Sequence, residues 1–160
     1  MLALTLAVSL AAAPQKLDWK DFWNISGVTR DDKKEDVIKK WGAPTEDRGK
    51  TLRWKEGPTV DFRDDGATQL DFSALWSMKF VAAHKSPPLE LLDLPCDAAA
   101  KRLAFAKKIE SYTSCKHYDA SGWLLDVTMM CTQGKVTTLV VVRVPVPELK
   151  TMKPLPVDHC

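Results

Sequence analysis

The segment from residue 51 to residue 72, TLRWKEGPTVDFRDDGATQLDF, carries the pattern that decides the fold. Apolar and polar residues alternate in three short runs, as expected for strands that bury one face. The runs are separated by Gly57-Pro58 and by Asp64-Asp65-Gly66, both of which favour turns. The segment therefore predicts an antiparallel meander of three strands.

A helix is expected immediately before this meander. Asp32 and Glu35 have the spacing of a capping box, and an apolar stripe follows them. Gly42 and Pro44 then form a typical helix end. Apolar residues at helical spacing predict a shorter amphipathic helix within residues 18–26.

The second half of the chain repeats this order of elements. An alanine-rich helix is expected at residues 97–109, and strands are expected at 111–118, 123–131 and 136–144. The last of these is long and rich in β-branched residues, which indicates a central or well covered strand. The repeated order favours an internal duplication.

The sequence thus predicts an α+β fold made of two helix-plus-antiparallel-meander units in tandem. Both meanders are expected to join one sheet, with the helices packed on one of its faces. The predicted divisions are a signal peptide (1–13), a first unit (14–82), a Pro-rich extended linker (83–95), a second unit (96–144) and an extended Pro-rich tail (145–160).

Residues 1–13 are typical of a secretory signal. They contain no charged side chain, they are mostly apolar, and they end in small residues. The run is shorter than the roughly 20 residues of a membrane-spanning helix, and no later segment is long and apolar enough. The expected location is therefore the periplasm or the extracellular space.

The chain has four cysteines, Cys96, Cys115, Cys131 and Cys160. An even number in an exported protein is typical of a disulfide framework, and four cysteines allow three pairings. The neighbouring predicted strands favour a Cys115–Cys131 bond. That bond would leave Cys96 to pair with Cys160 and to hold the tail on the body.

The residues from Ile25 to Thr29, the segment EDVIKKWGAPT at residues 35–45, and Leu52-Arg53-Trp54 carry a resemblance to known proteins. A helix ending in G-x-P and followed by a Trp-bearing strand resembles bacterial envelope domains related to the small lipoprotein of the β-barrel assembly machinery. In tandem, the same unit is similar to the β-lactamase-inhibitor-protein fold. The resemblance covers about residues 25–72, and it lacks the lipoprotein cysteine and the inhibitor's cysteine pattern. It implies a non-enzymatic protein that binds proteins or envelope components.

The composition excludes some partners. Lys and Arg number 23 against 21 Asp and Glu, a net charge of +2, so no strongly basic face for nucleic acid is expected. Only 7 residues are glycine, which argues against a glycine-rich nucleotide-binding fold. No cofactor, metal or catalytic residue is predicted.

We expect the protein to act by docking another envelope or secreted protein on a sheet face, as an assembly accessory or an inhibitor. The six tryptophans are numerous for this length, and tryptophan is enriched at binding hot spots. Trp41 is expected in the core. The residues predicted for the binding surface are Trp54, Trp76, Trp123, Arg53 and Arg63.

The alternative is a small secreted hydrolase or metal-dependent enzyme. Cys115, His117 and Asp119 alternate and would share one face of a strand, with Cys131 opposite them, which suits a metal site or a nucleophile. The carboxylates Asp61, Asp64, Asp65 and Asp71 also gather around one hairpin. Acid–base chemistry or calcium binding would use them. The favoured interpretation is a solvated face that Arg53 and Arg63 neutralise across strands.

Overall fold

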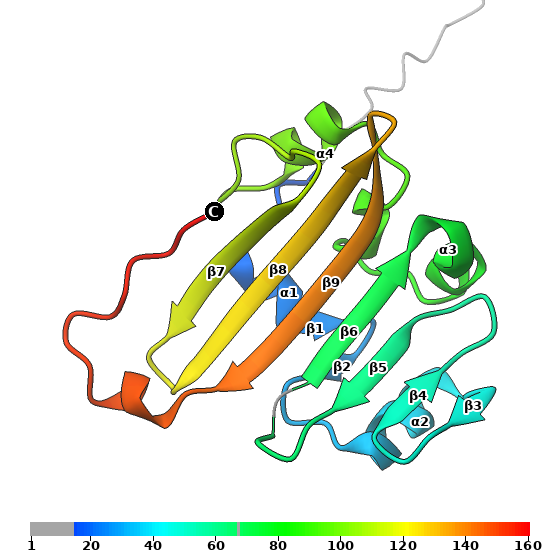
Figure 1. Cartoon of the computed structure of the whole chain (residues 1–160), viewed down its shortest axis with the longest axis horizontal. Coiled ribbons are helices and arrows are strands. Elements are labelled where there is room, and N and C mark those ends of the chain that lie inside the picture. Colours follow the sequence, from blue (N-terminus) through cyan, green and yellow to red (C-terminus); the bar gives the residue numbers. More distant parts are fainter. Residues whose placement is uncertain (1–14, 67) are drawn as a thin grey trace, which may run out of the picture.

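The structure is a computed structural model that describes residues 15–66 and 68–160 (Figure 1). The predicted signal peptide, residues 1–13, lies outside these residues. The fold is α+β, as expected, and its strands form a seven-stranded sheet in the order β3-β4-β5-β6-β9-β8-β7. Every neighbouring pair in this sheet is antiparallel.

The three strands expected in residues 51–72 are confirmed as β4 (Thr51–Arg53), β5 (Thr59–Phe62) and β6 (Thr68–Ser73). Those expected in the second half are β7 (Thr113–Asp119), β8 (Trp123–Thr132) and β9 (Lys135–Pro145). The two-residue strand β3 (Glu46–Asp47) lies at one end of the sheet. Pairing of β6 with β9 joins the two meanders into one sheet.

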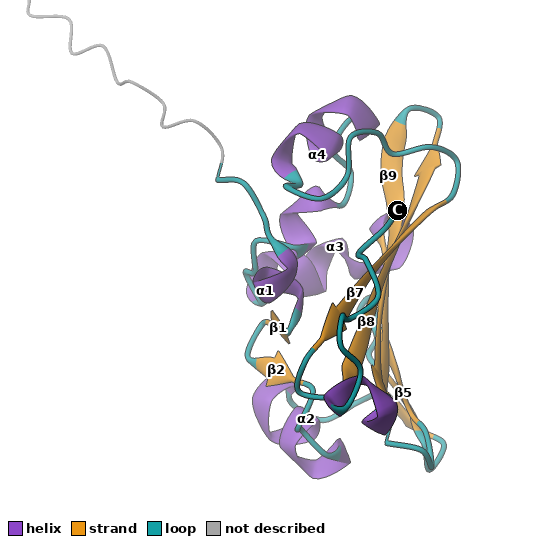
Figure 2. Cartoon of the chain, turned by 90° about the vertical axis from the view of Figure 1, so that its left-hand side faces the viewer, coloured by secondary structure: helices purple, strands orange, loops and turns teal. Residues whose placement is uncertain are grey.

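The remaining elements are α1 (Trp19–Phe22), a hairpin of β1 (Asn24–Ile25) and β2 (Val28–Thr29), α2 (Lys34–Trp41), α3 (Ala74–Ala83) and α4 (Cys96–Arg102). Short 3₁₀ turns are η1 (Leu89–Leu91) and η2 (Pro147–Lys150). Figure 2 shows α1, the β1–β2 hairpin, α2 and α4 on one side of the sheet. Helix α3 directly follows β6 at one end of the sheet (Figure 1).

The core lies between the sheet and this helical layer. The side chains of Phe22, Leu70, Phe72 and Leu139 are fully buried there. As expected, Trp41 belongs to this core, and its ring meets the rings of its aromatic neighbours edge-on. Burial of these large apolar surfaces stabilises the fold.

The predicted end of α2 is confirmed, whereas its predicted start is wrong. Gly42 has a φ of 84°, and its N–H donates to the carbonyl of Ile38, as expected for a glycine that ends a helix. Asp32 does not cap α2, because its carboxylate accepts from the N–H of Thr29 and pairs with Lys40. The N-cap is Lys33, and the helix starts at Lys34, one residue later than a cap at Asp32 predicts.

Helix α4 is shorter than predicted because the residues expected to form its second half pair with the N-terminal segment instead. It ends at Arg102, whose carbonyl accepts from the N–H of Leu17 at 2.6 Å. The N–H of Ala104 then donates to the carbonyl of Leu17 at 2.8 Å. Pairing with the N-terminal segment therefore holds Leu103 in an extended conformation.

The Pro-rich segment at residues 83–95 does not run extended throughout. It contains η1, and the side chains of Leu89 and Leu91 are fully buried in the core. Residues 84–94 therefore add apolar packing to the fold instead of acting as a solvated linker.

The disulfide bonds are Cys96–Cys131 and Cys115–Cys160, so the favoured Cys115–Cys131 pairing is wrong. The register explains this result. Cys115 lies opposite Val127 on β8, four residues before Cys131. At about 3.3 Å per residue, that offset exceeds the reach of a disulfide. The tail is still held on the body, but through Cys115.

Among the described residues, one charged side chain is fully buried. Arg143 of β9 donates from Nη2 to the carbonyls of Phe22 and Val28, at 3.1 and 3.2 Å. Burial lowers the pKa of Arg143 to about 10. The guanidinium therefore links the sheet to α1 and to the β1–β2 hairpin across the core.

Candidate docking surface

The sheet face that points away from the helical layer is covered by no helix of the described residues (Figure 2). Burial alternates strictly along β6, which identifies the side chains on this face. We call it the open face. Its side chains include Thr51, Arg53, Thr59, Asp61, Gln69, Asp71, Ser73, Thr138, Val140, Val142, Val144, Leu124, Asp126, Thr128, Met130, Ser114, Lys116 and Tyr118.

A hollow lies at the end of the open face, where α3 leaves β6. We call it the Trp76 hollow; its volume is about 470 Å³, and Trp76, Arg53 and Trp54 line it. A smaller hollow of about 110 Å³ shares Trp76 and Arg53 and extends to Asp71 and Thr138 on the sheet. The Trp76 hollow is therefore continuous with the open face.

The first turn of α3 positions Trp76. The hydroxyl of Ser77 accepts from the N–H of Ser73 at 3.1 Å, and the side chain of Ser77 is buried. With Ser77 and Phe80 facing the core, Trp76 is left 58% exposed. An exposed tryptophan on a firmly seated helix presents a large apolar surface at low entropic cost.

Gly57 fixes the opposite wall of the hollow. A Cβ atom at this position would lie 2.7 Å from Cβ of Trp54 and 3.3 Å from the ring of Phe80. The turn after β4 therefore lies tight against the core, with the N–H of Gly57 donating to the carbonyl of Trp54 at 3.2 Å. Only a residue without a side chain fits here.

Arg53 brings an uncompensated positive charge to the hollow. It is exposed, and it lies opposite Glu46 in the β3–β4 register. Glu46, however, pairs with Arg48 instead. Within the described residues, Arg53 has no ion-pair partner, so its guanidinium is free to meet a carboxylate.

Asp71 and Asp61 place two carboxylates on the neighbouring part of the open face. Burial raises the pKa of Asp71, and the negative charge of Asp61 adds to the rise, whereas a hydrogen bond from Gln69 opposes it. Asp61 accepts a hydrogen bond from Thr51. Arg53 neutralises neither carboxylate, contrary to the prediction of cross-strand pairing.

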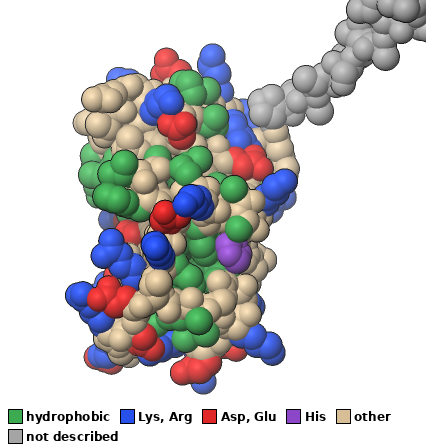
Figure 3. Space-filling model, turned by 90° about the vertical axis from the view of Figure 1, so that its right-hand side faces the viewer, with side chains coloured by type: hydrophobic (Ala, Val, Ile, Leu, Met, Phe, Trp, Pro, Cys, Tyr) green, Lys and Arg blue, Asp and Glu red, His purple; other side chains and the backbone are tan. Residues whose placement is uncertain are grey.

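Hydrophobic side chains gather on the side of the molecule that carries α3 (Figure 3). On that helix Leu75 is 75% exposed and Met78 is 42% exposed, in addition to Trp76. Lys79 of the same helix pairs with Glu56 at 2.6 Å beside the Trp76 hollow. Exposed apolar side chains rimmed by charges are typical of a protein-binding surface.

The other predicted binding residues lie elsewhere. Trp54 is only 7% exposed; its Nε1 donates to the carbonyl of Gly42, and only part of the residue reaches the hollow. Trp54 is therefore mainly a core residue and not an exposed anchor. Arg63 pairs with Asp65 in the turn after β5, away from Arg53.

Trp123 is half-buried and contacts an arginine. The guanidinium of Arg30 lies over the rings of both Trp23 and Trp123, 5.1 and 5.3 Å from their centroids, and pairs with Asp119 at 2.7 Å. Burial alone would raise the pKa of Asp119, but hydrogen bonds from Ser121 and Arg30 outweigh it and hold the pKa below its usual value. This cluster ties the β2–α2 loop to the sheet.

The metal or nucleophile cluster of the alternative hypothesis does not form in this arrangement. Cys115 and Cys131 are each bonded to another sulfur, so neither has a thiol. His117 contacts Asp158 through Nδ1 at 2.8 Å, and Asp119 is engaged with Arg30. The part of the chain that the structure describes contains no group of three metal-ligating side chains.

The four carboxylates that were expected around one hairpin do not form a single cluster. Asp64 contacts Lys50 and Asp65 contacts Arg63 in the turn, whereas Asp61 and Asp71 lie on the open face. Lys50 therefore neutralises Asp64, and Arg63 neutralises Asp65, both within the turn.

No protein-family model matches the chain, and neither the curated proteins nor the solved structures contain a match to it. The resemblance to envelope domains therefore remains a prediction. Within the described residues, no helix has the length and apolar character needed to cross a membrane.

Proposed function

We propose that the protein is an exported docking module that binds another protein on the open face, with Trp76 and Arg53 as anchors. The observation that carries this proposal is the pairing of a 58% exposed tryptophan with an uncompensated arginine at the end of an uncovered sheet face. Tryptophan and arginine are the residue types most enriched at interface hot spots.

The occupant that fits is a protein segment with an apolar side chain next to a carboxylate. The apolar group would cover Trp76 and the exposed Leu75, and the carboxylate would pair with Arg53. A bidentate arginine–carboxylate contact fixes the register of a partner, while burial of the tryptophan supplies most of the affinity.

Export is the second part of the proposal, with a periplasmic or secreted location. Two disulfide bonds support it, since such bonds persist in oxidising compartments. The disulfides also lock the helical layer and the tail to the sheet, which keeps the open face rigid for docking. A rigid surface binds at lower entropic cost.

Site-specific photo-crosslinking in the cells that make the protein tests the proposal. A photoreactive amino acid would replace Thr138 on the open face and, as a control, the exposed Lys39 on α2. The proposal predicts one discrete crosslinked protein from position 138 and none from position 39. The same adduct from both positions, or no adduct from position 138, would contradict it.

Other occupants give different results in the same experiment. A second copy of the chain would give an adduct of twice its own mass and a dimer in light scattering. A glycan or lipid surface would leave no protein adduct. Either outcome would replace a separate protein partner as the occupant of the open face.

A further inference from the structure

The C-terminal tail follows the outer edge of β7 (Figure 1). The N–H of Lys116 donates to the carbonyl of His159 at 2.7 Å, and the N–H of His159 donates back at 3.1 Å. The carboxylate of Asp158 accepts from the N–H of Tyr118 at 3.1 Å and contacts His117. The last residues of the chain thus occupy the position of an eighth strand.

This edge is the longer of the two ends of the sheet. The opposite end is β3, which has two residues, whereas β7 has seven. A bare edge strand presents unpaired N–H and carbonyl groups on which an added strand assembles. The tail therefore covers the one edge in the described sheet that is long enough to receive another chain.

Little besides the disulfide holds the tail in place. No side chain between residues 151 and 160 is buried, and Val157 is 84% exposed. A few hydrogen bonds at the surface do not outweigh the conformational entropy of an ordered segment. The Cys115–Cys160 bond is therefore the main restraint on the tail.

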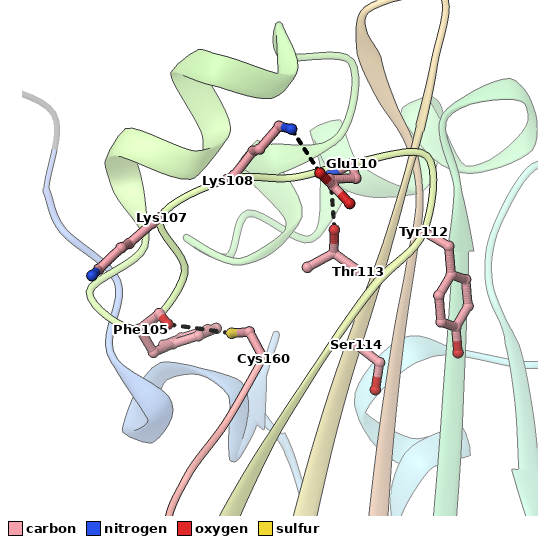
Figure 4. Close-up of a pocket in the computed structure, with 8 residues that line it drawn as sticks. All are labelled: Phe105, Lys107, Lys108, Glu110, Tyr112, Thr113, Ser114 and Cys160. Atoms are coloured by element: carbon pink, nitrogen blue, oxygen red, sulfur yellow. Dashed lines mark hydrogen bonds and ion pairs between the residues drawn. The ribbon is translucent and has the colours of Figure 1, made fainter.

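The two sulfur atoms of this bond differ in access. Cys115 is fully buried, whereas Cys160 is exposed at the end of the chain. Figure 4 shows Cys160 beside Phe105, at a hollow of about 440 Å³, and its Sγ lies 3.2 Å from the carbonyl oxygen of Phe105. A reductant would therefore reach Sγ of Cys160 first.

We propose that residues 157–160 form a redox-releasable strap, and that its release exposes the β7 edge to an extended peptide that carries an acidic side chain. One thiolate of a dithiol reductant attacks Sγ of Cys160, and Sγ of Cys115 leaves as a thiolate and takes up a proton. The second thiol of the reductant then displaces Cys160. The dithiol becomes a disulfide, and both cysteines become thiols.

The tail itself shows which peptide fits the exposed edge. Asp158 places its carboxylate against the N–H of Tyr118 and against the side chain of His117 on the same strand. An extended peptide with an acidic side chain at the corresponding position would repeat these contacts. This inference is independent of docking on the open face.

Amide hydrogen exchange on the full chain tests the strap. The Cys160→Ser variant keeps the Cys96–Cys131 bond but removes the covalent restraint on the tail. We expect at least tenfold faster exchange at the amides of Lys116 and Tyr118, with no change at the core amide of Val127. Unchanged exchange at Lys116, or faster exchange throughout the sheet, would overturn the proposal.

A labelled peptide with the sequence of residues 152–160, carrying serine in place of Cys160, tests the exposed edge. It should bind the double variant Asp158→Asn, Cys160→Ser, whose own tail lacks both the carboxylate contacts and the disulfide and therefore competes poorly. It should not bind the oxidised wild type. A peptide with asparagine in place of Asp158 should bind at least tenfold more weakly. Equal binding to the oxidised protein would overturn the proposal.

A measurement on the wild type guards against a variant that fails to fold. Limited dithiothreitol followed by alkylation should label Cys115 and Cys160 before Cys96 and Cys131. Simultaneous labelling of all four cysteines would show that the strap does not open separately from the body.

Discussion

Leu70 of β6 and Val141 of β9 lie opposite each other across the junction of the two meanders, and both side chains are fully buried. The six residue pairs of this junction join strands from the two halves of the chain. Because the apolar side chains of both halves lie in one core, we expect the halves to unfold together.

The Leu70→Ala variant tests this junction. Loss of the buried side chain should lower the free energy of unfolding by about 2–5 kcal/mol. Calorimetry should still show a single transition for the wild type and for the variant. Two separate transitions would mean that the two meanders are independent units.

Asp71→Asn should stabilise the protein at neutral pH. Burial raises the folded-state pKa of Asp71 above the ordinary value of an aspartate, so its charged form is disfavoured in the fold. Stability is therefore lost as pH rises from the unfolded-state value through the folded-state pKa, and the loss is complete above it. The asparagine variant avoids this loss.

Thermal unfolding at two pH values measures the effect. The melting temperature of Asp71→Asn should exceed that of the wild type at about pH 7, and the difference should shrink at about pH 3, where Asp71 is protonated. Asp64→Asn, in the exposed turn, is the control. A difference in melting temperature that grows on acidification would show that the fold lowers the pKa of Asp71 instead of raising it.

Trp54 and Trp76 should respond differently to truncation. Trp54→Ala removes a core side chain and should cost about 3–5 kcal/mol of unfolding free energy. Trp76→Ala removes a mostly exposed side chain and should change stability by about 0.5 kcal/mol or less. Chemical denaturation of both variants distinguishes the two positions, and equal losses would place Trp76 in the core.

A non-reducing digest should contain Cys96 linked to Cys131 and Cys115 linked to Cys160. Mass spectrometry of the linked peptides provides the check, with a reduced digest as the control. A peptide that links Cys115 to Cys131 would contradict the register between β7 and β8.

The strands and α2 were predictable because their apolar residues follow regular periods and their ends carry turn residues. Helix α3 was not predicted, because its sequence ALWSMKFVAA is apolar almost all round and shows no helical period. Because β6 ends directly before α3 begins, the sequence also does not show where the helix starts or how long it is. The signal for its role was the presence of Trp76 beyond the last predicted strand of the first unit.

Features that depend on contacts far along the chain could not be predicted from local patterns. Leu17 ends α4 at Arg102, and the offset between Cys115 and Cys131 decides the disulfides. The burial of Arg143 within a β-branched strand is of the same kind, since carbonyls more than one hundred residues away receive its hydrogen bonds. Alternation did predict that Asp61 and Asp71 share the polar face of the sheet.

The central claim is that the partner docks through Trp76 and Arg53. Once the crosslinked partner is purified, its affinity for matched variants of the protein tests this claim most directly. Trp76→Ala and Arg53→Glu should each weaken binding by at least tenfold, or about 1.4 kcal/mol, at unchanged melting temperature. The controls Met152→Ala and Arg63→Glu change exposed side chains outside the hollow and should bind as the wild type does. Equal affinity of all four variants would contradict docking through Trp76 and Arg53.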